Sequence, residues 1–178
     1  MLFFGHTGTT LGLLWLLNKI IFKEKQPDYR LAFLGSILPD IIDKPLGLIL
    51  LRYNLGDGRT FAHTLIFPVL LFIIGLYFAR RKENNLILLS ACVAGHLILD
   101  QMWLEPSVFF WPAYGIIFPY HRGDTFWVWF YQWLSQLKFN PQVFVPEITG
   151  FTILLIMFIY LVKNKKISIF IWQGKFFK

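Results

Sequence analysis

The sequence predicts an all-α protein: a polytopic membrane helical bundle with about four spanning helices, a broken half-helix and short interfacial helices. Three observations lead to this fold class. Of the 178 residues, 56% are hydrophobic and only 15% are charged, which is far more apolar than a soluble domain. Several apolar runs approach the roughly 20 residues that a helix needs to cross a bilayer. No Ser/Gly-rich or low-complexity linker divides residues 1–178, so we expect a single integral membrane domain.

Four apolar runs predict the spanning helices. The clearest is 61–79, because at about 1.5 Å per residue it roughly matches a hydrocarbon core of about 30 Å. Residues 7–22, 86–104 and about 148–162 are similar in character. The first and last of these runs are short for a straight crossing, although a helix start near Pro146 would lengthen the last one.

Two further segments predict helices that do not cross the bilayer. Asp28 is a good N-cap for a helix over residues 28–37, and Pro39 should interrupt that helix partway across. A break at membrane depth is tolerated where it lines a polar cavity, so a site could be built there. Prolines also divide the tryptophan-rich strip 105–146, which indicates short helices at the level of the lipid headgroups.

The basic residues predict the orientation of the bundle. Although the net charge is +7, the basic residues gather at the ends of apolar runs, at Lys23 and Lys25, at 80–82 and at 163–166. This placement is typical of cytoplasmic flanks, and it argues against nucleic acid as a partner. We therefore expect a multi-pass protein of the cell membrane whose C-terminus is cytoplasmic.

Polar side chains near apolar runs mark a candidate site, because a charged group costs about 2.5–3.5 kcal/mol at a helix centre. His96 and Asp100 are four residues apart, so they share one helix face and could hold a metal ion or hydrogen-bond each other. Asp40 and Asp43 follow the expected helix break. Their carboxylates could bind a metal ion, or Asp40 could cap a loop.

Two other histidines complete the candidate set. Thr60 is the expected N-cap of a helix with His63 in its first turn, where a neutral imidazole could coordinate a metal or lie at the headgroups. His6 starts the first span between Gly5 and Gly8. The predicted topology brings these residues to the extracytoplasmic side, and the sequence therefore predicts a metal site made of His6, Asp40, His63, His96 and Asp100.

Four motifs carry a resemblance to a known family over about the first 105 residues. They are His6, Gly35-x-x-x-Pro39-Asp40-x-x-Asp43, Arg59-Thr60-x-x-His63-Thr64 and Gly95-His96-x-x-x-Asp100. In order and rough spacing they resemble the LexA-binding, inner-membrane-associated, metal-dependent hydrolase family. That family is in turn similar to zinc-dependent phospholipase C, and residues 105–178 add no motif that matches.

The resemblance implies a zinc centre in the inner membrane. Asp40, His63, His96 and Asp100 would bind one zinc ion, while His6 and a shared Asp100 would help to hold a second. The further histidine and the His-x-x-x-Glu motif of the phospholipases have no counterpart, so we expect one or two ions. The remaining histidine, His121, is a weaker candidate for the site.

The activity expected of such a metal centre is hydrolysis of an ester or phosphodiester in a lipid or lipid-linked substrate by a metal-activated water. Asp40 or Asp43 would accept the proton of the water, or Asp43 would orient a ligand histidine. Arg59 would clamp a phosphate or anchor its loop to headgroups. The alternative is a membrane protein without enzymatic activity that binds or transports metal ions or protons. Crowding of the polar residues at one end of the bundle argues against a transport path.

Overall fold

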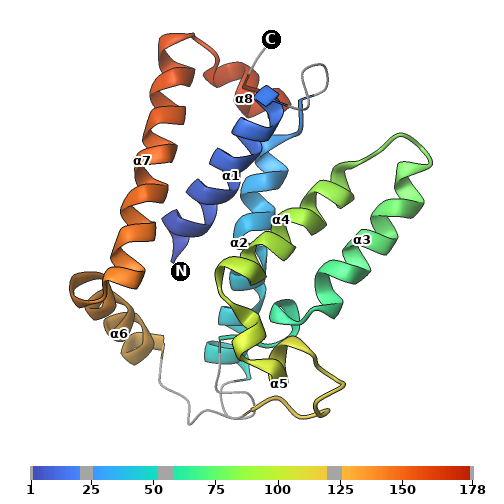
Figure 1. Ribbon diagram of the computed structural model, residues 1–178, viewed down its shortest axis with the longest axis vertical. Coiled ribbons are helices and arrows are strands. Elements are labelled where there is room, and N and C mark those ends of the chain that lie inside the picture. The colour runs from blue at the N-terminus through green and yellow to red at the C-terminus, as the bar shows by residue number, and fades with distance from the viewer. Residues whose placement is uncertain (1, 21–25, 52–57, 120–125, 177–178) are drawn as a thin grey trace.

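The computed structural model describes residues 2–20, 26–51, 58–119 and 126–176, and within them it contains helices and no strand. The all-α prediction is therefore confirmed. In Figure 1, α1, α2 and α4 lie between α7 on one side and α3 on the other. These five helices are α1 (Phe3–Ile20), α2 (Tyr29–Pro45), α3 (Ile66–Ala79), α4 (Asn85–Leu99) and α7 (Pro141–Lys163).

Shorter helices lie at the ends of this bundle (Figure 1). A π-helix follows α2 directly, and 3-10 turns precede α3 and follow α4. The short helices predicted within 105–146 are present as α5 and α6, and their depth in the membrane stays a prediction. The bounds are α5 (Pro106–Phe109), α6 (Phe126–Phe139), α8 (Ile167–Gln173), the π-helix Leu46–Leu50 and the 3-10 turns Phe61–His63 and Met102–Leu104.

The lengths of the apolar helices differ from those expected. In the described part of the chain, α7 is the one helix long and apolar enough to cross a membrane, whereas the sequence predicted about four. The expected span 61–79 is shortened because its first residues form a 3-10 turn whose amides donate to the Asp43 carboxylate. The expected span 86–104 ends as an α-helix at Leu99. Conversely, α7 begins at Pro141, earlier than the expected 148.

The predicted break at Pro39 is wrong, because α2 runs through this residue and ends at Pro45. A proline removes one helical hydrogen bond and crowds the preceding turn, but neighbouring groups can satisfy the freed backbone. Here α2 packs along α4, where a Cβ at Gly35 would lie 2.8 Å from the Cβ of Cys92. The carbonyl of Ser36, in the same turn, accepts a hydrogen bond from the His96 ring. Tertiary packing therefore overrides the local break.

Close contact between α1 and α7 depends on two glycines. A Cβ added to Gly8 would overlap the backbone of Gly150, and a Cβ added to Gly150 would overlap the carbonyl of Phe4. Small residues at a helix crossing let two backbones approach closely, as is common in membrane bundles. This crossing holds the beginning of α1, where His6 lies, against α7.

We expect Gly150→Ala to lower the free energy of unfolding by about 1–3 kcal/mol, since overpacking forces the two backbones apart. The matched control is Gly95→Ala on α4, because a Cβ at Gly95 meets nothing within 4 Å. That variant should keep or slightly raise stability through better helix propensity. Thermal unfolding in detergent compares the two variants, and equal midpoints would contradict the packing.

The start of α2 and the end of the chain are joined by hydrogen bonds. Asp28 is the N-cap of α2, as predicted, and its side chain accepts from the backbone N–H of Arg30 at 2.9 Å. The Arg30 guanidinium pairs with the same carboxylate at 2.6 Å and donates to the carbonyls of Ile171 and Trp172, each at 3.0 Å. Through Arg30, the cap therefore also docks α8.

The Asp28 cap should make stability depend on pH. The hydrogen bond from the Arg30 side chain holds the pKa of the Asp28 carboxyl below its usual value. Charged Asp28 thus stabilises the fold above about pH 4, and this contribution is lost as the pH falls through the lower folded-state pKa. We expect Asp28→Ala to lose about 1 kcal/mol at pH 6, the typical value of a cap, and less at pH 3. Denaturant unfolding at both pH values measures this, and an equal loss at the two would contradict it.

Candidate metal centre

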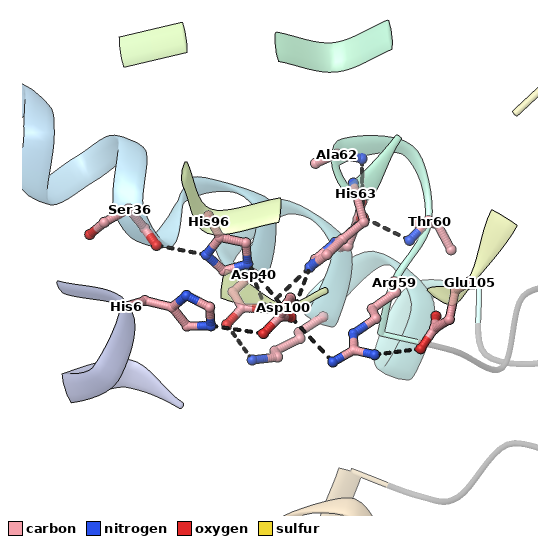
Figure 2. Close-up of polar contacts among 12 residues, drawn as sticks. His6, Ser36, Asp40, Arg59, Thr60, Ala62, His63, His96, Asp100 and Glu105 are labelled. Atoms are coloured by element: carbon pink, nitrogen blue, oxygen red, sulfur yellow. Dashed lines mark hydrogen bonds and ion pairs between the residues drawn. The ribbon is translucent and has the colours of Figure 1, made fainter. Parts of the chain in front are cut away.

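Side chains distant in sequence meet where α1 begins and α4 ends. Figure 2 shows them converging from separate elements, with ring nitrogens and carboxylate oxygens turned toward one another. The structure thereby brings together every residue of the predicted metal set. They are His6 in the first turn of α1, Asp40 in α2, His63 at the end of the 3-10 turn, His96 in α4 and Asp100 at the C-cap of α4.

The Nδ1 atom of His96 is hydrogen-bonded outside the site, and its Nε2 atom faces the site. Its Nδ1 lies 2.7 Å from the carbonyl oxygen of Ser36, and the side chain is fully buried. Its Nε2 lies 3.9 Å from Asp40 Oδ1 and 3.9 Å from Asp100 Oδ2. Because 3.9 Å is too long for a hydrogen bond, the His96–Asp100 bond that the spacing allowed is not formed. The ring is oriented as a ligand histidine is, with a backbone carbonyl on its second nitrogen.

His63 is oriented in the same manner by a carboxylate. Its Nδ1 lies 2.8 Å from Asp43 Oδ2, and both side chains are fully buried. Its Nε2 lies 3.6 Å from Asp40 Oδ1 and 4.0 Å from Asp100 Oδ2. A carboxylate that binds one ring nitrogen of a histidine fixes the ring orientation and the tautomer. Histidines that bind a metal through the other nitrogen usually have such a partner.

Asp43 also organises the turn that carries His63. Its carboxylate accepts backbone N–H groups of Thr60 at 2.7 Å, Ala62 at 3.0 Å and His63 at 3.1 Å. The predicted N-cap, Thr60, makes no capping hydrogen bond with its side chain, so Asp43 caps this turn instead. With its oxygens committed to these donors, Asp43 fits the orienting alternative better than the role of proton acceptor.

Four atoms form a compact set that fits a divalent metal: Asp40 Oδ1, His63 Nε2, His96 Nε2 and Asp100 Oδ2. Each imidazole-to-carboxylate distance among them is between 3.6 and 4.0 Å. Ligand atoms of a tetrahedral zinc bound at about 2.0–2.1 Å lie about 3.4 Å apart, which is slightly shorter than these four distances. Among the described residues, neither Nε2 atom has a hydrogen-bond partner although both are buried. Buried polar atoms without partners are costly, and a metal ion would satisfy both.

His6 lies beside this set of four atoms. Its Nε2 is 3.0 Å from Asp100 Oδ1, and its ring stacks on that of His96 with the centroids 4.0 Å apart. Two overlapping groups could each hold an ion, namely His6 with His96 and Asp100, and Asp40 with His63 and His96. Because only one nitrogen of His96 faces the site, these groups cannot be two independent three-ligand sites.

Two cations flank the ligand carboxylates. Lys44 Nζ lies 2.5 Å from Asp40 Oδ2, one helical turn along α2. Arg59 reaches Asp100 Oδ2 at 3.2 Å and pairs with Glu105 at 2.6 Å. Both cationic side chains are about a third exposed, at 30% and 35%. Arg59 was predicted from the sequence to lie near the site, whereas Lys44 was not, although its i+4 spacing from Asp40 was a usable signal.

Other predicted positions are less informative. His121 and the basic residues Lys23 and Lys25 lie outside the described residues. Ser36 was not predicted as part of the site, because it contributes through its backbone carbonyl and its residue type therefore gave no signal. Asp40 lies within α2 and does not cap a loop, which removes the structural alternative considered for it.

Comparison with known protein families gives a match that covers most of the chain. A family model described as YdjM inner membrane protein matches residues 1–168. The match continues through the C-terminal region, where the motif resemblance ended at about residue 105. No curated protein and no solved structure matches the chain.

Proposed function

This chain belongs to the YdjM inner membrane protein family, and on that premise we propose that it is a membrane-bound, metal-dependent hydrolase. The observation that carries the proposal is the pair of buried Nε2 atoms of His63 and His96. Each ring is anchored by its other nitrogen, and each free nitrogen faces two carboxylates. A purely structural bundle has no need of such an arrangement, because satisfied histidines would hydrogen-bond through both nitrogens.

In the proposed arrangement the bundle crosses the membrane several times. The helix α7 is the longest membrane-spanning helix, and the shorter apolar helices α3 and α4 also span the membrane. Many apolar side chains of α3 and α7 are exposed, as a lipid-facing surface requires. The basic residues at 80–82 and 163–166 would then be cytoplasmic. This orientation places the metal centre toward the extracytoplasmic face and the C-terminus in the cytoplasm.

The four-atom set would hold the ion, most suitably zinc, given its mixture of imidazole and carboxylate ligands. When bound, a divalent ion supplies Lewis-acid activation of water and of a scissile ester group. Asp43 and the Ser36 carbonyl keep the two imidazoles in place. Of the three aspartates, Asp40 is the most accessible, at 17% exposure against 4% for Asp100 and 0% for Asp43. We therefore assign proton acceptance from the attacking water to Asp40.

The surroundings of the site favour an ester or phosphodiester of a lipid or lipid-linked substrate. Arg59 and Lys44 lie beside the ligand carboxylates, where their charge would attract a substrate phosphate. The segment after α5 exposes large apolar side chains, including Ile116 at 80% and Ile117 at 89%. Such side chains are stable in contact with lipid, from which a substrate of this class would enter.

Turnover of lipid esters and phosphodiesters by the protein purified in detergent tests the proposal. We expect wild-type hydrolysis that a chelator abolishes and added zinc restores, and loss of this activity in His96→Ala. The control Gly95→Ala alters the neighbouring position, where a Cβ meets nothing within 4 Å, and should keep activity. Metal binding without turnover, accompanied by metal-dependent flux into vesicles, would instead support the transport alternative.

A further inference from the structure

A buried glutamate on α7 binds the beginning of α1. The side chain of Glu147 accepts backbone N–H groups of Leu2 at 2.7 Å, Phe4 at 2.9 Å and Gly5 at 2.9 Å. The residue is only 5% exposed, although it lies in α7, the described helix that is long and apolar enough to cross a membrane. An ionisable group within such a helix is costly unless it is paired or functional. Among the described residues, its three hydrogen-bond donors all belong to the beginning of α1.

α1 depends on this carboxylate for its cap. The first amides of a helix have no partner within the helix, and they are usually satisfied by a Ser, Thr, Asp or Asn side chain just before it. The residue before Phe3 is Leu2, which has no capping group. Glu147 supplies the missing acceptors from another helix, and its negative charge faces the positive end of the helix dipole. Gly150, one turn further along α7, packs against the carbonyl of Phe4.

The capped turn carries His6. The amide of Gly5 immediately precedes it in the chain, and His6 Nε2 reaches Asp100 Oδ1 at 3.0 Å. We infer that Glu147 is a positioning residue of the metal centre, which holds the first turn of α1 so that His6 stays against Asp100. The inference rests on the proposed metal centre for its purpose, whereas the contact that it explains exists without an ion. It also gives the C-terminal region, which had no matching motif, a part in the site.

Ring-nitrogen NMR of metal-free protein labelled with ¹⁵N-histidine tests the inference independently of metal binding. In Glu147→Gln, the His6 resonances should move toward those of Asp100→Asn, because the amide side chain can no longer accept all three N–H groups. The His63 resonances should stay, since Asp43 anchors that ring and His6 does not stack on it. A merely stabilising role would leave the His6 ring unmoved in the folded variant, and that result would overturn the inference.

A second variant restores the cap locally. Leu2→Ser places an N-cap residue directly before α1, so adding it to Glu147→Gln should return the His6 resonances toward their wild-type positions. This double variant also provides a folded protein should Glu147→Gln alone fail to fold. A folded double variant in which His6 remains displaced would overturn the inference. Failure of both variants to fold would overturn it as well, because Glu147 would then serve folding as a whole.

Cobalt affinity gives the functional arm of the test. Glu147→Gln and His6→Ala should each weaken Co²⁺ binding by about 10-fold, as expected for loss of an orienting group, and the double variant should be no weaker than His6→Ala. The control Asn140→Ala removes the local cap of α7, where Asn140 accepts the Gln142 N–H at 3.0 Å, and should leave affinity unchanged. Additive effects would overturn the inference. Absence of Co²⁺ binding in the wild type would refute the proposed function, while the ring resonances would still decide the role of Glu147.

Discussion

His96→Ala is expected to weaken Co²⁺ binding by the detergent-solubilised protein by more than about 100-fold, the upper range for losing an orienting group alone. The reason is geometric. The Nε2 atom of His96 faces both ligand carboxylates, at 3.9 Å from Asp40 Oδ1 and 3.9 Å from Asp100 Oδ2. Alanine removes this ligand and leaves three. Titration of Co²⁺ followed by visible absorption measures both affinity and coordination geometry.

Ser90→Ala is the matched control for this prediction. Ser90 lies on the same helix and donates a buried hydrogen bond to the carbonyl of Pro68 at 2.8 Å, so its loss disturbs α4 without touching a ligand. Its Co²⁺ affinity should equal that of the wild type. If both variants lose affinity equally, the effect arises from helix packing and the assignment of His96 as a ligand is contradicted.

Asp43→Asn is expected to destabilise the metal-free protein by about 3–5 kcal/mol, as breaking a buried charge network does. The carboxylate accepts three backbone amides and the Nδ1–H of His63. An asparagine side chain would direct its NH₂ group at donors. Because His63 then loses its anchor, Co²⁺ affinity should also fall, by about 10- to 100-fold. Denaturant unfolding and Co²⁺ titration measure the two effects.

Asp40→Asn separates ligand loss from structural loss. Asp40 is partly exposed, and its ion pair with Lys44 is partly exposed too. Exposed pairs contribute about 0–1 kcal/mol, so this variant should lose metal affinity while keeping most of its stability without metal. An Asp43→Asn variant as stable as Asp40→Asn would contradict the capping role of Asp43.

The site was more predictable than the helices that carry it. The i, i+4 spacing of His96 and Asp100 fixes one helix face regardless of tertiary structure. The topology predicted from the basic residues at the helix ends also assigned His6 and His63 to the same side as this pair. Helix continuity through Pro39 could not be predicted, because it depends on packing against α4 and on the His96 ring beside the Ser36 carbonyl. Local propensity is a weak guide wherever such contacts compete with it.

Contributions made through the backbone also lay beyond sequence reasoning. Asp43 was considered as a base or an orienting residue, yet nothing in residue type indicated that it caps the turn Phe61–His63. Glu147 lies next to the expected last span 148–162, and its partners are amides about 140 positions away, the nearest in sequence being Gly5 at a separation of 142. Amides leave no compositional signal, so the coupling of α7 to the site required the folded chain.

The central claim is that the buried His/Asp set binds a divalent ion, and elemental analysis of wild-type protein tests it most directly. Protein purified in detergent without chelator, then exposed to limiting zinc and desalted, should retain one ion per chain. The ion should be lost in His96→Ala and retained in Ser90→Ala. Wild-type protein that is folded, yet retains no more zinc than His96→Ala does, would contradict the account.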